Sequence, residues 1–204
     1  EVRHDLAHVP LSPPSRTSGV LEVFRRRYLL RLLVRRAIQA PLKRRWRQHT
    51  NEPDPEKRLR VGFTGGDFRA HSAAYMFGTI YEHLDRERFE VVTYADLSTT
   101  DQVTDWFRDA SNGWRDVTAW PDEVIAEAVR RDRIDVLIDL HGLSSGARPG
   151  IMALRPAHLQ GTYLGFIGTT AMPWIDFVVA DRFALPDDLT PYFSETPLYI
   201  DGAF

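Results

Sequence analysis

The sequence contains no cysteine among its 204 residues. This absence excludes a disulfide scaffold, a thiolate zinc site, an iron–sulfur cluster and a cysteine nucleophile. No apolar run reaches the roughly 18 residues of a transmembrane helix, and arginines interrupt the most apolar early stretch, Val20 to Ile38, before it could form a signal-peptide core. A cysteine-free chain suits a reducing compartment, so we expect a cytoplasmic protein.

Several ligand-binding motifs are also missing. Gly62, Gly65 and Gly66 surround the end of an apolar stretch, but they do not have the spacing of a dinucleotide-binding loop. The sequence has no Walker A loop, no H-E-x-x-H motif and no histidines at metal-ligand spacing. These absences disfavour a nicotinamide-dependent dehydrogenase, and we expect neither a metal ion nor a bound cofactor.

The charge is divided unevenly along the chain. Residues 1–50 hold 12 Lys and Arg against 3 Asp and Glu, and the rest of the chain holds 14 against 25. A split of this size indicates two structural units. The proline-containing residues 1–19 are predicted to form a loop or disordered lead-in, 20–49 a basic helical segment, and 50–58 a polar linker. Residues 59–204 then form the second unit.

The basic segment 20–49 has apolar residues at helical spacing, with arginines filling the remaining positions. We interpret it as a solvated helix, or as the end of a helical array, packed on the following domain. Contact with an anionic membrane is the less favoured alternative. Aromatic residues are sparse there and no nucleic-acid motif accompanies the charge, so we expect no nucleic-acid partner.

From residue 59 onward, apolar strands alternate with helices, which predicts an α/β fold. The expected strands are Leu59–Thr64, Phe89–Ala95, Ile134–Leu140, Leu159–Leu164 and Ile175–Ala180. The expected helices are Ala73–Leu84, Asp101–Ala110, Asp122–Asp132 and residues 149–155. This order indicates a Rossmann-like parallel sheet with helices on both faces. The last 24 residues contain three prolines and are predicted to be connecting chain.

Three predicted strands end in loops rich in glycine and small hydroxyl residues. These loops cover residues 65–72, 139–148 and 164–170. Because the carboxyl ends of parallel strands share one edge of the sheet, the loops should lie together and form a crevice for a polar ligand. Glycines there would let backbone N–H groups approach a ligand closely.

Two histidines in these loops have alternative roles. His71 precedes a helix and could act in general acid–base chemistry, or it could cap the helix or pack at its start. His141 could face the ligand, or it could bond to a neighbouring loop. Asp139 ends a buried strand, where it could accept N–H groups from its loop, and Asp67 could form a local ion pair with Arg69.

Five segments in order resemble the catalytic region of glycosyltransferase family 41, the protein O-linked N-acetylglucosamine transferases and their bacterial relatives. The segments are LRVGFTGGDFRAHS (59–72), FEVVTYA (89–95), IDVLIDLHG (134–142), ALRPAHLQ (153–160) and YLGFIGTT (163–170). The resemblance continues from Asp176 and covers residues 59–201.

The resemblance implies the first half of a GT-B glycosyltransferase, whose second half would carry most nucleotide contacts and is missing here. It implies a uridine diphosphate (UDP) sugar as donor, a protein or peptide as acceptor, and no metal. His71 matches the loop histidine discussed as a base or substrate-positioning group. The positions that match residues near the sugar, or that lie in the same loops, are His141, Ser144, Leu164, Gly165, Ile167, Gly168 and Thr169.

Three departures from the family pattern fall in these loops. Leu143 replaces a histidine that is usual in bacterial members, Ile167 replaces a proline, and Ala171 replaces a glycine. These departures leave the identity of the donor sugar open. We therefore expect a fragment of an enzyme that transfers N-acetylglucosamine or a related hexose to protein Ser/Thr, and we expect the fragment alone to be inactive. The alternatives are a non-catalytic module that binds a sugar nucleotide or a protein, and an asparagine-directed glucosyltransferase.

Overall fold

The computed structural model describes residues 49–51, 54, 56–166 and 168–201. The predictions for the lead-in at 1–19 and for nearly all of the basic segment at 20–49 lie outside the described residues, as does Ile167. Within the described part, no helix is long and apolar enough to cross a membrane.

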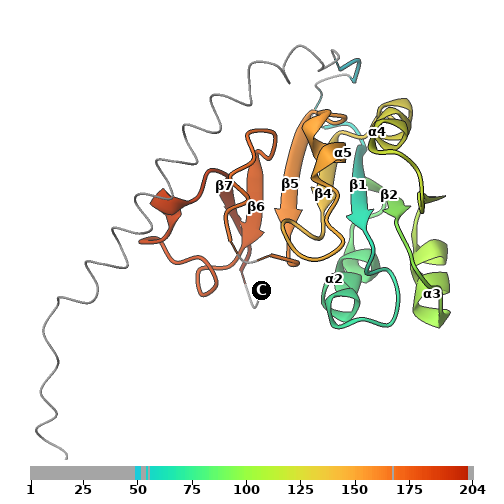
Figure 1. Cartoon of the computed structure of the whole chain (residues 1–204), viewed down its shortest axis with the longest axis horizontal. Coiled ribbons are helices and arrows are strands. Elements are labelled where there is room, and N and C mark those ends of the chain that lie inside the picture. The colour runs from blue at the N-terminus through green and yellow to red at the C-terminus, as the bar shows by residue number, and fades with distance from the viewer. Residues whose placement is uncertain (1–48, 52–53, 55, 167, 202–204) are drawn as a thin grey trace, which may run out of the picture.

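The core of the described chain is a seven-stranded sheet in the order β3-β2-β1-β4-β5-β6-β7 (Figure 1). Every neighbouring pair is parallel. The strands are β1 (Leu59–Gly65), β2 (Phe89–Ala95), β3 (Gly113–Asp116), β4 (Val136–Asp139), β5 (Leu159–Tyr163), β6 (Phe177–Ala180) and β7 (Thr196–Tyr199). All strands therefore end at one edge, which confirms the predicted parallel α/β sheet.

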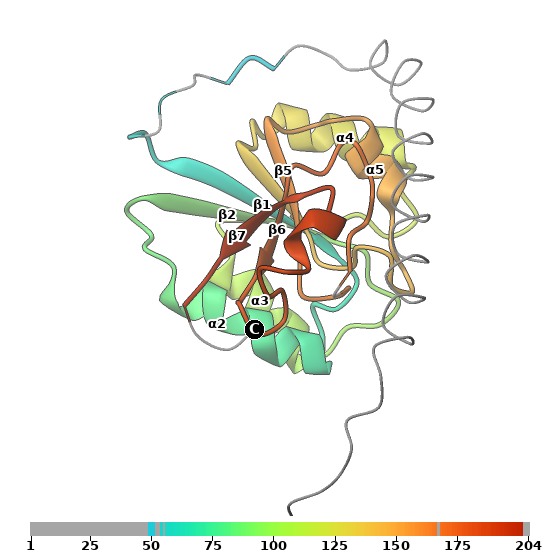
Figure 2. The same ribbon diagram turned by 90° about the vertical axis from the view of Figure 1, so that its left-hand side faces the viewer.

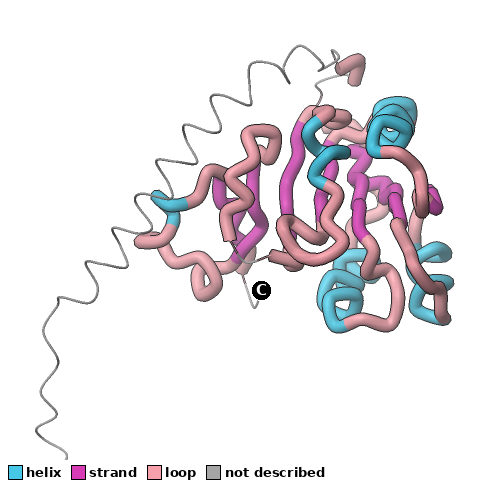
Figure 3. Tube along the Cα trace, in the orientation of Figure 1, coloured by secondary structure: helices cyan, strands magenta, loops and turns pink. Residues whose placement is uncertain are grey.

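Helices cover both faces of this sheet (Figures 2 and 3). The helices are α2 (Ser72–His83), α3 (Gln102–Ala110), α4 (Asp122–Arg131) and α5 (Pro149–Ala153), with a 3-10 turn, η1, at Thr190–Tyr192. Phe77 of α2 and Phe107 of α3 belong to one buried cluster, and Ile125 of α4 and Ile151 of α5 to another. The two clusters are the two apolar layers that hold the helices against the sheet.

Two strands were not predicted from the sequence. β3 has only four residues, none of them buried, so it lacks an apolar strand pattern. β7 contains Pro197, and the prediction that this region is only connecting chain was wrong. Proline is tolerated because β7 is the last strand of the described sheet, where one side of the strand needs no N–H donor.

Two buried threonines of the sheet differ in whether their hydroxyl groups are hydrogen-bonded, and replacing each of them tests how this difference affects stability. The Thr162 hydroxyl on β5 has no hydrogen-bond partner, whereas the Thr93 hydroxyl on β2 bonds to Tyr81 and Ser111, each at 2.8 Å. We expect Thr162→Val to leave stability unchanged or raise it by up to about 1 kcal/mol, because it removes an unpaired hydroxyl. Thr93→Val should cost about 1–3 kcal/mol. Urea unfolding of both variants measures the contrast, and equal losses would contradict it.

Candidate functional site

His141 joins the first two loops at the carboxyl edge of the sheet. The backbone N–H of Gly66, after β1, donates to Nε2 of His141 at 2.8 Å. Because Nε2 accepts this bond, the proton of the neutral ring lies on Nδ1, which faces the Ser144 hydroxyl at 3.2 Å. The side chain is buried, and both ring nitrogens are occupied by the protein. The interpretation that His141 bonds a neighbouring loop is confirmed, while its contact with a sugar stays a prediction.

The third loop packs directly against the second. A Cβ atom on Gly165 would lie 2.0 Å from the carbonyl oxygen of Leu140, so only glycine fits this approach. Gly142 has a φ of +59°, and a Cβ there would lie 2.7 Å from Phe166. Leu164 also adopts a left-handed backbone, with a φ of 70°, which is a strained conformation for leucine. The sequence therefore brings His141, Ser144, Leu164 and Gly165 together, as predicted.

Asp139 closes the turn that leads into the second loop. Its carboxylate accepts the backbone N–H groups of His141 at 3.1 Å and of Gly142 at 2.8 Å. The prediction that Asp139 accepts loop N–H groups is confirmed. Burial raises the pKa of the Asp139 carboxyl, and the two N–H groups oppose this rise because they stabilise the charged form.

His71 caps the helix that follows the first loop. It is the N-cap of α2, and its Nδ1 accepts the N–H of Ala73 at 3.3 Å. Oδ2 of Asp67 also lies 3.5 Å from the same Nδ1. The predicted ion pair between Asp67 and Arg69 does not form among the described residues. The Asp67 carboxylate lies against His71 instead. Nε of Arg69 is buried without a hydrogen-bond partner.

The two contacts of His71 select different proton positions. If Nδ1 accepts from Ala73, the neutral ring carries its proton on Nε2 and can donate to a ligand. If Nδ1 donates to Asp67, Nε2 is unprotonated and can accept a proton. The His71 side chain is 39% exposed, so a ligand can reach it. The loop geometry thus allows both an orienting and a base role.

Glu195 holds the end of the third loop beside the start of β7. Its buried carboxylate accepts the Thr169 hydroxyl at 2.6 Å and the Thr170 backbone N–H at 2.8 Å. Since Glu195 immediately precedes β7, these contacts lie at the starting end of that strand. The Thr169 hydroxyl also accepts N–H groups from Ala171 and Ser194, which uses its full hydrogen-bonding capacity. Any contact of Thr169 with a ligand would therefore use its backbone.

A Cβ atom on Gly168 would lie 2.8 Å from the ring of Phe166, so Gly168 lies close against this ring. Contact of Gly168 with a ligand stays a prediction.

Arg148 and Glu195 organise these loops, but neither was identified from the sequence. Both act through partners that are far away along the chain, so no local spacing could reveal them.

In the described part of the chain, no three His, Asp or Glu side chains form a group that could hold a metal ion.

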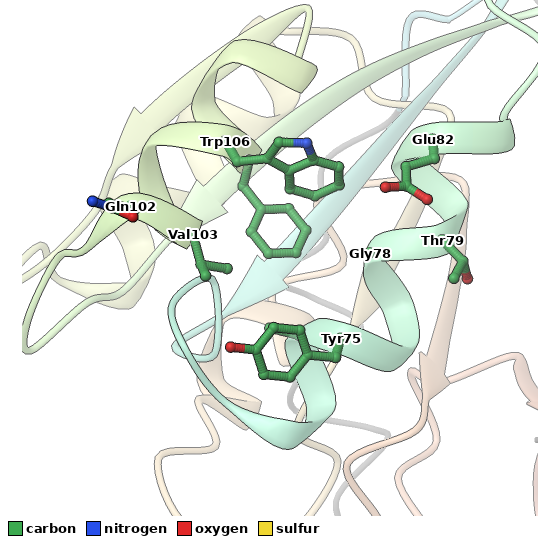
Figure 4. A pocket seen from close by; sticks show the side chains of 9 residues that line it. Tyr75, Gly78, Thr79, Glu82, Gln102, Val103 and Trp106 are labelled. Atoms are coloured by element: carbon green, nitrogen blue, oxygen red, sulfur yellow. The ribbon is translucent and has the colours of Figure 1, made fainter.

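A separate pocket lies between α2 and α3, with a volume of about 290 Å³ (Figure 4). Tyr75, Gly78, Val103 and Trp106 are among the residues that line it. None of the predicted site residues lines this pocket, and its surface is mostly apolar. No Lys, Arg or His among the described residues lines this pocket to bind a diphosphate, so we keep the carboxyl-edge loops as the candidate site.

Comparison with known proteins finds the family that the sequence resembles. The family model described as "Glycosyl transferase family 41" matches residues 32–204. The chain is 36% identical over 151 residues to a probable UDP-N-acetylglucosamine–peptide N-acetylglucosaminyltransferase, SEC, of Arabidopsis thaliana, covering 72% of this chain and 15% of that protein. It is 33% identical over 153 residues to a UDP-N-acetylglucosamine–peptide N-acetylglucosaminyltransferase of Caenorhabditis elegans, covering 72% of this chain and 13% of that one.

A solved structure of a mutant O-GlcNAc transferase from Thermobaculum terrenum superposes with a TM-score of 0.77 and 34% identity. The match covers 87% of this chain and 34% of the bacterial chain. This chain therefore spans about a third of that structure and a smaller share of the curated relatives. The similarity confirms the expected type of fold.

Proposed function

Because the chain belongs to glycosyltransferase family 41, we propose that it supplies one wall of the active site of a protein glycosyltransferase. The donor is a UDP-sugar, with N-acetylglucosamine or a related hexose as the transferred group, and the acceptor is a protein Ser or Thr. The two relatives described above are named for this peptide-directed transfer. A second wall, formed by the region that these relatives have beyond the match, completes the site.

One observation carries this proposal: three of the five segments that resemble the family, 59–72, 134–142 and 163–170, meet at the carboxyl edge of the sheet. The loops after β1 and β4 are joined by His141, and the loop after β5 packs on Leu140 through Gly165. Ligands of parallel α/β sheets bind at this edge. The shared edge supports a ligand site rather than a series of unrelated packing contacts.

The chemistry assigns a distinct task to His71. The acceptor hydroxyl oxygen attacks the anomeric carbon of the sugar, the bond to UDP breaks, and UDP leaves with the bonding electrons. The hydroxyl proton must be lost, and the imidazole of His71 orients the hydroxyl or accepts that proton. His141, Ser144, Leu164, Gly165, Ile167 and Gly168 belong to the donor side of the site.

A transfer assay on the full-length gene product tests the proposal. Labelled UDP-N-acetylglucosamine is incubated with the protein and a pool of Ser/Thr-containing peptides, and product formation supports the proposal. Release of the label by alkaline β-elimination identifies attachment to Ser or Thr, whereas base-stable label on asparagine supports the asparagine-directed alternative. Saturable binding of the UDP-sugar without transfer supports the non-catalytic module.

The 204-residue chain alone is expected to give no transfer and weak or undetectable binding of UDP. Its loops face solvent, and water competes for the hydrogen bonds that they would make to a ligand. Calorimetry with UDP and a transfer assay with the purified chain measure the two quantities. Turnover by this chain would show that the second wall is unnecessary.

A further inference from the structure

Arg148 ends the second loop and connects it to two other segments at the carboxyl edge. Its Nε donates to Asp122 at 2.9 Å, and its Nη1 donates to Asp96 at 3.3 Å. Its Nη2 donates to the carbonyl of Trp120 and again to Asp122. All three guanidinium nitrogens are engaged, and the side chain is 23% exposed. A planar guanidinium can fix several acceptors at once, which a lysine ammonium cannot do with the same geometry.

These contacts bring the end of the second loop back to the first loop. Asp96 follows β2, and its backbone N–H donates to the carbonyl of Gly65 at 2.9 Å. The other end of the second loop is held by His141, which accepts the N–H of Gly66. Residues 141–148 are thus fastened at both ends to the same dipeptide, Gly65-Gly66. The first end uses a histidine and the second uses the Arg148–Asp96 pair.

The segment between these two attachments has few backbone hydrogen bonds of its own. Ser144 donates its N–H to the carbonyl of His141 at 2.9 Å, and Ala147 donates to the carbonyl of Ser144 at 3.1 Å. Leu143 is exposed, and so are Ser145 and Gly146. The Ser144 hydroxyl also faces Nδ1 of His141 at 3.2 Å. The position of Ser144 relative to the first loop therefore depends on its contacts with His141 and on the attachments at the two ends of the segment.

We propose that Arg148 is a positioning residue for the donor side of the site. It fixes the second loop against the first and so sets where His141 and Ser144 meet the UDP-sugar. The proposal rests on the proposed function, because it assigns these loops to a donor. Loss of the Arg148 contacts should impair productive donor binding in a molecule that still folds, since Arg148 lies at the edge and not in either buried cluster.

Arg155 provides a matched control. It lies seven positions later, just beyond the other end of α5, and its guanidinium also binds three residues: it donates to the carboxylate of Asp176 and to the backbone carbonyls of Trp174 and His158. Its side chain is buried to a similar degree. His158 and Asp176 lie just before β5 and β6, so this second arginine serves the opposite edge of the sheet.

The test compares Arg148→Lys with Arg155→Lys in the full-length gene product. Both variants should lower the melting temperature, because both lose a fork-shaped set of hydrogen bonds. Only Arg148→Lys should lower kcat/KM for the UDP-sugar, by about 10²-fold, since a small misplacement of a binding group has an effect of this size. The KM for the peptide acceptor should change little.

Each result decides the proposal. Equal losses of kcat/KM in the two variants, or none in Arg148→Lys, would overturn it while leaving the proposed function intact. If the wild-type protein binds the UDP-sugar without transfer, a weaker dissociation constant in Arg148→Lys alone supports the positioning role although the transferase function fails. If the wild-type protein neither transfers nor binds any UDP-sugar, both proposals are wrong.

Discussion

Replacement of His71 by alanine in the full-length protein is expected to lower the rate of sugar transfer by about 10²–10⁴-fold, as for loss of a general acid–base group. The imidazole is partly exposed beside the candidate site, and its Nδ1 contacts are supplied by the protein. Steady-state kinetics at saturating donor and acceptor measure the loss. Near-normal turnover in a correctly folded variant would remove His71 from the reaction.

His71→Ala alone cannot separate catalysis from helix capping, because it removes both. Loss of an N-cap costs about 0.5–2 kcal/mol. The matched control is His71→Asn, since asparagine is among the best N-cap residues but has no imidazole. We expect His71→Asn to keep the stability of α2 in urea unfolding and to remain as inactive as the alanine variant. Recovery of transfer by asparagine would show that His71 is only a cap.

The sequence predicts the sheet well where strands are apolar and long. β2 begins and ends as predicted, and β1 extends only one residue further, because both have seven residues with buried side chains over most of their length. β3 and β7 were not predicted because they are short and lie at the two ends of the described sheet, where side chains are least buried. Pattern reasoning therefore finds the central strands, which are the strands that carry the loops of the site.

The candidate site is predictable in its location but not in its internal bonding. Parallel strands must end at a shared edge, so the meeting of the three loops follows from topology alone. The Glu195 contact with Thr169 joins residues 26 positions apart, and the Arg148 contact with Asp96 joins residues 52 positions apart. Such pairs are set by the three-dimensional packing, and spacing along the chain does not encode them.

The loop after β5 should tolerate no side chain at Gly165. In Gly165→Ala the new Cβ would meet the Leu140 carbonyl oxygen at 2.0 Å and the Cα of His141 at 2.9 Å. Both atoms belong to the backbone, so the clash is relieved only by moving one loop away from the other. We expect a loss of about 1–3 kcal/mol in urea unfolding of the 204-residue chain, as for overpacking, and a severe loss of donor binding in the full-length protein.

Gly78→Ala is the matched control for this substitution. Gly78 lies inside α2, where the added Cβ would meet the rings of Phe107 and Trp106 at ordinary distances of 3.6 Å. Since glycine weakens a helix relative to alanine, this variant should gain about 0.5–1 kcal/mol. Opposite signs for the two glycine variants would show that close loop packing, and not loss of glycine as such, holds the site together. A Gly165→Ala variant as stable and active as Gly78→Ala would contradict the packing of the third loop on the second.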